Sequence, residues 1–165
     1  EAERARLERL IRSVQDTIGA EERKELMSDE QKFEAFKKQV VDHNEETYGA
    51  EIRARYGDAQ VNEANAAVLG LTREKYREWT GLGEEIRKRL EEAVRAGLSP
   101  ESGEGEEICA LHRRWLTITG NRYDPAKHRG IAELYVADER FTAYYDRNLP
   151  GCARFLRDAV AHWAG

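Results

Sequence analysis

Apolar side chains recur at three- and four-residue spacing along most of the chain, which is the period of an amphipathic helix. Apolar stripes of this kind span about Glu106 to Thr119, Pro125 to Val136, and Pro150 to the end of the chain. No stretch alternates convincingly with the two-residue period of a strand, so the pattern predicts an all-α fold. The longest predicted helix runs from Thr72 to about Ala96 and presents one clean apolar face: Tyr76, Trp79, Leu82, Ile86, Leu90 and Ala93.

Capping residues mark where several of these helices begin. Ser28 with Gln31 three residues later has the form of a capping box. Asp124 is a predicted N-cap, and the proline that follows it occupies the first helical position, where a missing N–H costs nothing. Thr72 and Asp138 are expected to open two more helices.

Two segments are predicted to interrupt the helical pattern. Asn44 to Thr47 is polar and indicates a break, and Leu98 to Glu107, with a proline, two glycines and four glutamates, indicates a solvated loop. Gly57 and Gly70 are expected to end helices between these segments. From Ser28 to Gly70 the apolar content is thin, so we expect these helices to be weakly held unless something packs beside them.

The first segment, Glu3 to Ile18, carries a narrow apolar seam formed by Leu7, Leu10, Ile11, Val14 and Ile18. A lone helix of this length is marginal in water and cannot bury such a seam by itself. The helix could pack on its own domain, or it could be the end of a dimerisation coiled coil. We favour the second interpretation because the chain begins at Glu1, without methionine and already inside a helical pattern, as part of a longer protein would. We therefore divide the chain into the end of a dimerisation helix (1–20), a linker (21–27) and a helical domain (28–165).

Composition narrows the possible partners. The chain has 165 residues and a net charge of −5, and its acidic and basic residues are mixed rather than blocked. Without a basic stripe, direct contact of this chain with nucleic acid is not expected. There is neither an apolar run long enough to span a membrane nor a signal peptide.

The chemistry-bearing residues give no sign of catalysis or of a bound metal. Neither Cys109 nor Cys152 belongs to a Cys-x-x-Cys pair, and two thiols in a chain of this size are typical of a reducing, cytoplasmic compartment. No nucleophile is paired with a base, and no carboxylates are paired, so we assign no catalytic residue and expect neither enzymatic activity nor a cofactor. The four histidines lack the spacing of zinc ligands: His43, His112, His128 and His162.

The densest stretch of the chain lies between residues 121 and 141, where aromatic residues, a histidine and two caps are close together. His128, Ile131, Ala132 and Tyr135 share one helical face. The run from Leu134 to Phe141, Leu-Tyr-Val-Ala-Asp-Glu-Arg-Phe, resembles the signature of the TipA-like (TipAS) antibiotic-recognition effector domain of MerR-family transcriptional regulators.

The resemblance extends from about Ser28 to Ala164. Shorter similar segments are Phe33 to Phe36, Arg55 to Gly57, the Thr72, Tyr76 and Trp79 set, His112-Arg113 with Trp115, Pro150-Gly151, and Phe155 to Ala159. It implies a haem-free, globin-like helical domain that binds bulky antibiotics, typified by thiopeptides, in a cleft. In this family the N-terminal helices order around the drug.

The resemblance also implies a setting for the domain. Residues 28–165 would be the ligand-binding domain, and residues 1–20 the tail of the helix through which the regulator forms a homodimer. A DNA-binding domain would lie upstream in the parent protein. Drug binding would then switch transcription, or a stand-alone form would simply sequester the drug as a resistance protein.

One departure from the family bears on the chemistry of binding. In thiopeptide-capturing members a cysteine follows the Tyr-Asp pair and can add to dehydroamino acids of the drug. Here Asp124 is followed directly by Pro125, and that cysteine is absent. Cys109 and Cys152 lie on apolar helix faces, as inert core thiols do. We therefore expect non-covalent binding, of a thiopeptide or of another aromatic or peptide-like drug.

Bulky apolar ligands bind where aromatic rings line a cleft that holds a few polar groups. Each candidate also fits a structural role, since the rings could pack in the core, His128 could satisfy a neighbouring group, and Asp124 could act only as a cap. A purely structural dimerisation module therefore remains the alternative. Our candidates are Trp79, Trp115, Tyr123, His128 and Tyr135 for the walls, Asp124 for the lip, and Phe33, Phe36 and Tyr56 for a lid.

Overall fold

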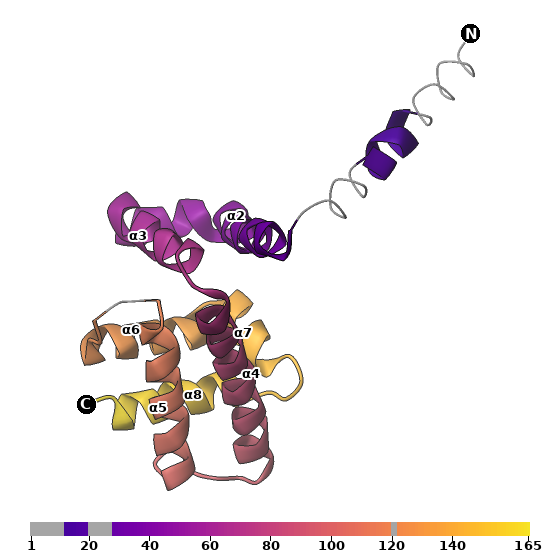
Figure 1. Cartoon of the computed structure of the whole chain (residues 1–165). Helices are drawn as coiled ribbons and strands as arrows, with labels where there is room; N and C mark the ends of the chain where they lie inside the picture. Colours follow the sequence, from indigo (N-terminus) through magenta and orange to yellow (C-terminus); the bar gives the residue numbers. More distant parts are fainter. Residues whose placement is uncertain (1–11, 20–27, 120–121) are drawn as a thin grey trace, which may run out of the picture. The chain divides into compact units, whose positions relative to one another are not determined.

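The computed structural model describes residues 12–19, 28–119 and 122–165. Within these ranges the regular structure is entirely helical (Figure 1), so the all-α prediction is confirmed for them. None of their helices is long and apolar enough to cross a membrane. The chain divides into two compact units, one ending at Leu69 and one beginning at Gly70.

The first unit contains helices α2 (Asp29–Tyr56) and α3 (Asp58–Leu69). The predicted capping box is present, because the Ser28 side chain accepts from the Gln31 N–H at 3.2 Å and the Gln31 side chain accepts from the Ser28 N–H at 2.9 Å. Gly57 separates the two helices with a φ of +81°, a backbone conformation that favours glycine. This confirms the predicted helix ends around Gly57.

The predicted break at Asn44 to Thr47 is wrong, because α2 continues through it. The Glu45 carboxylate accepts hydrogen bonds from Arg53 at 3.0 Å and from Asn65, on α3, at 2.6 Å. These polar side chains join α2 to α3 and do not end a helix. The polar side chains of this segment make contacts between two helices. Local sequence does not show such contacts, because the partner lies on the other helix.

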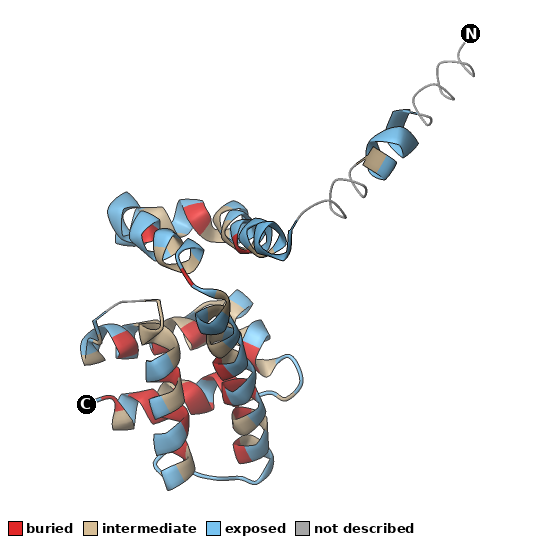
Figure 2. Cartoon of the chain, in the orientation of Figure 1, coloured by how far each residue is buried: buried red, intermediate tan, exposed pale blue. Residues whose placement is uncertain are grey.

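The first unit buries few apolar side chains, as its sequence predicts. Val61 is the buried hydrophobic residue among those described on α2 and α3, and Figure 2 shows most of both helices as exposed or intermediate. A charged residue occupies another buried position: Lys37, 2% exposed, donates to the Leu69 carbonyl at 2.6 Å and pairs with Glu34 at 2.7 Å. Polar contacts therefore carry much of the packing between these helices.

The second unit is built around its last helix. Helix α8 packs against each of the other four helices described in this unit, and its buried face, with Cys152, Leu156 and Val160 at 0% exposure, forms the centre of the core (Figure 2). The helices of this unit are α4 (Arg73–Arg95), α5 (Gly103–Thr117), α6 (Pro125–Ala137), α7 (Glu139–Asp146) and α8 (Cys152–Trp163).

The predicted starts of α4 and α7 are confirmed. Thr72 caps α4 by accepting from the Lys75 N–H at 3.2 Å, and Asp138 caps α7 by accepting from the Arg140 N–H at 2.9 Å. The predicted length ranking is wrong, since α2 has 28 residues and α4 has 23. Helix α8 begins at Cys152, two residues later than predicted.

The loop predicted from Leu98 to Glu107 is wrong in its second half. Helix α5 already begins at Gly103, and Ser102 is its N-cap. A Cβ atom on Gly105 would lie 1.8 Å from the Pro100 carbonyl oxygen, so the helix and the preceding turn approach too closely for any side chain. Gly105 therefore permits a close contact within a helix, and it does not mark a loop.

Candidate functional site

The site begins at the start of α6, where local sequence sets the backbone. The Asp124 carboxylate accepts from the N–H groups of Ala126 at 2.9 Å and Lys127 at 3.3 Å, and Pro125 fills the first turn, as predicted. One turn later the helix carries His128 into the protein, where only 1% of its surface is exposed. The cap thus fixes the position of a buried histidine.

A hydrogen-bonded chain of four side chains runs inward from Tyr123. The Tyr123 Oη lies 3.0 Å from His128 Nδ1, and His128 Nε2 lies 2.7 Å from His112 Nδ1. His112 Nε2 lies 3.1 Å from the Tyr135 Oη. Every ring nitrogen of the two buried histidines therefore has a partner, as buried polar groups require.

A stack of aromatic rings crosses three helices beside this chain. Trp79 on α4 stacks on Trp115 at 5.6 Å between ring centroids, with an interplanar angle of 18°. Trp115 stacks on His112 at 5.8 Å and 12°, and His112 on His128 at 4.9 Å and 28°. Such a stack presents flat apolar faces with polar edges, which suits aromatic ligands.

The two histidines are electrically neutral. Burial, with a smaller contribution from His128, lowers the pKa of His112 to about 3. Burial also lowers the pKa of His128 to about 4, and the nearby cations Arg113 and Arg129 add to the effect. At neutral pH each ring therefore carries one N–H, so it donates one hydrogen bond and accepts another.

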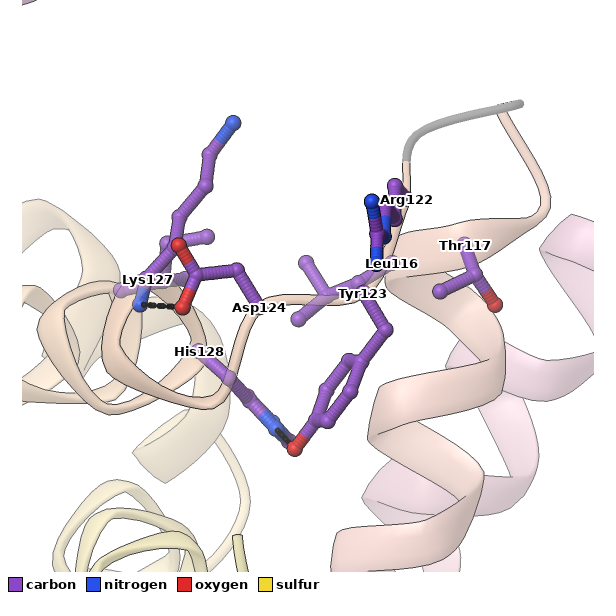
Figure 3. Close-up of a pocket in the computed structure, with 8 residues that line it drawn as sticks. Leu116, Thr117, Arg122, Tyr123, Asp124, Lys127 and His128 are labelled. Atoms are coloured by element: carbon purple, nitrogen blue, oxygen red, sulfur yellow. Dashed lines mark hydrogen bonds between the residues drawn. The ribbon is translucent and has the colours of Figure 1, made fainter. Parts of the chain in front are cut away.

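A small pocket of about 60 Å³ opens beside Tyr123 and His128. Figure 3 shows the Tyr123–His128 hydrogen bond beneath Asp124, with Arg122 and Lys127 on opposite sides. The Arg113 guanidinium carbon lies 3.9 Å from the Tyr123 ring centroid, in a cation–π contact. The pocket lining combines apolar, polar and cationic side chains: Leu116, Thr117, Arg122, Tyr123, Asp124, Lys127, His128 and Ile131.

The candidate wall residues come from three helices and the segment before α6, and they meet in one cluster. Trp79, Trp115, Tyr123, His128 and Tyr135 are joined by ring stacking and by the hydrogen-bonded chain. Tyr135 lies at the inner end of that chain, 7% exposed, so it supports the site from within the core.

The remaining candidates, Asp124 and the three lid residues, lie outside this cluster. Asp124 caps α6, as predicted, and it also lines the pocket, while its contact with a ligand stays a prediction. The three candidate lid residues lie on α2 in the first unit, where Phe36 is 49% exposed, Tyr56 is 39% exposed and Phe33 is half-buried. Their part in a lid stays a prediction.

Sequence reasoning missed His112 as a site residue. This side chain is fully buried and joins His128 to Tyr135, so it is the centre of the cluster. The available signal was its spacing, because His112 lies on the buried face of α5 four residues after Ile108 and three before Trp115. A histidine at an apolar position needs a polar partner, and here the partners come from another helix.

The cysteines are placed as predicted. Cys109 is 4% exposed and Cys152 is 0% exposed, and both thiols are free. Burial raises the pKa of Cys109 and raises that of Cys152 to about 11, so neither is a reactive thiolate at neutral pH. Within the described ranges, no three histidine, cysteine or acidic side chains are grouped as metal ligands would be.

Several transcription regulators are similar to this chain. The activator TipA of Streptomyces coelicolor is 27% identical over 158 residues, which cover 94% of this chain and 60% of that protein. The regulator SkgA of Caulobacter vibrioides is 29% identical, over 99% of this chain and 64% of that protein. The activator mta of Bacillus subtilis is 25% identical, over 94% of this chain and 60% of that protein. The chain thus spans somewhat under two thirds of these relatives.

A solved structure confirms the predicted type of fold. It is TipAS of Streptomyces lividans in complex with nosiheptide, described as part of a thiopeptide antibiotic multidrug resistance system. The match has a TM-score of 0.64 and 27% identity, and covers 84% of this chain and 94% of that one. The family model of the TipAS antibiotic-recognition domain matches residues 48–163. The chain therefore belongs to the TipAS antibiotic-recognition domain family.

Proposed function

We propose that this chain is the drug-binding effector domain of a MerR-type transcription regulator. Its ligand would be a bulky antibiotic, either a thiopeptide or another aromatic or peptide-like drug. The observation that carries the proposal is the aromatic–histidine cluster, Trp79 to His128, which ends at a pocket in a domain of an antibiotic-recognition family. Flat rings beside a few fixed polar groups suit ligands of this chemical class.

Binding would be non-covalent. Cys109 and Cys152 are buried, with raised thiol pKa values, and Asp124 is followed by Pro125 with no cysteine between them. A drug that carries an electrophile would therefore meet no accessible thiolate among these groups. Affinity would come from stacking, hydrogen bonds and apolar burial alone.

The first unit would act as a lid. The pocket beside Tyr123 has a volume of about 60 Å³, whereas sites for drug-sized ligands measure about 300–1,000 Å³. A bulky drug must therefore gain contacts from elsewhere, and Phe33, Phe36 and Tyr56 on α2 are the proposed source. The thin apolar burial within α2 and α3 supports this role, because weakly held helices can reorder around a ligand.

The parent protein would add DNA binding and dimerisation. The chain spans about 60% of the length of TipA, so a DNA-binding domain would be part of the remainder. Residues 1–20 would be the end of the dimerisation helix. In the described part of that segment, Val14 and Ile18 are 56% and 53% exposed. Such exposure is expected of apolar residues that pack against a second helix in a coiled coil. The predicted residues Leu7, Leu10 and Ile11 lie outside the described residues.

A titration with nosiheptide tests the proposal, with tryptophan fluorescence, far-UV circular dichroism and intact mass followed together. All three tryptophans lie in the second unit, and two of them, Trp79 and Trp115, belong to the proposed wall. We expect a saturable fluorescence change and no gain in mass. Trp79→Phe should weaken binding more than Trp163→Phe, which removes a tryptophan outside the cluster. A purely structural dimerisation module would show self-association that no drug alters.

A further inference from the structure

Four side chains form the hydrogen-bonded chain: Tyr123, His128, His112 and Tyr135. When both histidines are neutral, only two protonation patterns keep all of its hydrogen bonds. In the first, both rings are protonated at Nδ1: Tyr135 donates to His112, His112 to His128, and His128 to the Tyr123 oxygen. In the second, both rings are protonated at Nε2 and every bond reverses. The first pattern leaves the hydroxyl hydrogen of Tyr123 free to donate, and the second leaves only its lone pairs.

Only the first pattern lets the pocket offer a hydrogen-bond donor from Tyr123. In the second pattern the hydroxyl hydrogen of Tyr123 is already donated to His128 Nδ1. At the inner end, Tyr135 donates to His112 in the first pattern and accepts from it in the second. The two patterns therefore differ in which nitrogen of each histidine carries the proton.

The surroundings of Tyr123 are cationic. Arg122 and Lys127 line the pocket, and neither side chain has an ion-pair partner among the described residues. Arg113 lies over the ring of Tyr123. The carboxylate in the lining belongs to Asp124, and it already accepts two backbone N–H groups. The pocket is therefore locally positive, although the chain as a whole carries a net charge of −5.

We infer that the pocket beside Tyr123 receives an anionic hydrogen-bond acceptor of the ligand, for which a carboxylate is the best fit. The Tyr123 hydroxyl donates to this group, and the cationic side chains of Arg122 and Lys127 belong to the same pocket lining (Figure 3). A volume of about 60 Å³ suits one polar end of a ligand, with its larger apolar part outside. This inference rests on the proposed function as a drug receptor, and it adds the chemistry that the receptor selects.

The first test reads the direction of the hydrogen-bonded chain without any ligand. Two-bond ¹⁵N–¹H correlation spectra of the labelled chain at pH 7 identify the protonated nitrogen of each histidine. We expect Nδ1–H for both His112 and His128. Finding Nε2–H on both would mean that Tyr123 offers only lone pairs to the pocket, and would overturn the inference whatever nosiheptide does.

The second test compares two probes of nearly equal shape, 2-naphthoate and its neutral amide, 2-naphthamide. Binding is followed by backbone amide shifts of residues 122–131. A charge-assisted hydrogen bond predicts that the carboxylate binds about tenfold more tightly than the amide. Tyr123→Phe should remove most of this preference, and Tyr144→Phe, which alters an exposed tyrosine on α7, should keep it.

The outcomes separate the inference from the proposed function. Equal affinity for the two probes, or an unchanged preference in Tyr123→Phe, would overturn the inference even if nosiheptide binds. Nδ1–H histidines with a preference for the carboxylate that depends on Tyr123 would support it, even if nosiheptide fails to bind. In that case the thiopeptide class would be wrong, and acidic aromatic drugs would remain as ligands.

Discussion

Acidification from pH 7 to pH 5 is expected to destabilise the second unit through its two buried histidines. Their pKa values in the folded chain are about 3 for His112 and about 4 for His128, against an ordinary value of 6.5. A folded-state pKa below the unfolded one means that the unfolded chain binds more protons. The free energy of unfolding therefore falls as the pH drops below 6.5, and goes on falling until the folded-state pKa values are reached.

The size of this effect follows from the two pKa values. Between pH 7 and pH 5 each histidine contributes a loss of about 2 kcal/mol, and the pair about 4 kcal/mol, if they titrate independently. The free energy of unfolding of such a domain is about 5–15 kcal/mol, so this loss would be a large part of it. The carboxylate with a strongly lowered pKa, Asp138 at about 2, loses its contribution only below pH 4, outside this window.

Urea unfolding at pH 7 and pH 5, followed by tryptophan fluorescence, measures this loss in the second unit. His128→Gln retains a donor and an acceptor at that position but cannot gain a proton, so it should remove about half of the pH dependence. His162→Gln, at an exposed position on α8, is the control and should leave most of it. Equal unfolding midpoints at pH 7 and pH 5 would refute the assignment of His112 and His128 as a buried neutral pair.

Two further pairs of variants test the packing. Gly105→Ala should destabilise the chain by about 2 kcal/mol or more, since its Cβ would overlap the Pro100 carbonyl. Gly103→Ala, on the same helix with nothing within 4 Å, should be neutral or stabilising by thermal unfolding. Tyr135→Phe should cost about 1–3 kcal/mol in urea unfolding, because the buried His112 ring loses a hydrogen-bond partner. The exposed Tyr144→Phe should cost less than 1 kcal/mol, and similar losses for the two tyrosines would contradict the account.

Local sequence was enough to predict most helix starts. Ser28, Thr72, Asp124 and Asp138 each satisfy backbone N–H groups within three residues, so the information lies in a few neighbouring positions. The clustering of the residues proposed for the wall was also predictable, because aromatic residues at helical spacing face inward. Their part in ligand binding stays a prediction. The family resemblance added the expectation of a cleft and of a ligand class.

The predictions were wrong or incomplete where the role of a residue is set by a contact outside its own helix. The polar run around Glu45 indicated a break, but it bonds to Asn65 on the next helix. Gly105 indicated a loop, but it makes room for the Pro100 carbonyl. His112 carried no local sign of function, because its partners His128 and Tyr135 lie 16 and 23 residues further along the chain. Such contacts depend on tertiary structure, which helical periodicity alone does not encode.

The most direct test of the central claim is to map where nosiheptide binds, by amide hydrogen exchange of the chain with and without the drug. We expect added protection in residues 112–135, around the aromatic–histidine cluster, and in α2 and α3 as they close as a lid. Intact mass of the same sample should show no covalent addition. Saturable binding with protection confined to other parts of the chain, or with a gain in mass on Cys109 or Cys152, would contradict a non-covalent drug site at Tyr123 and His128.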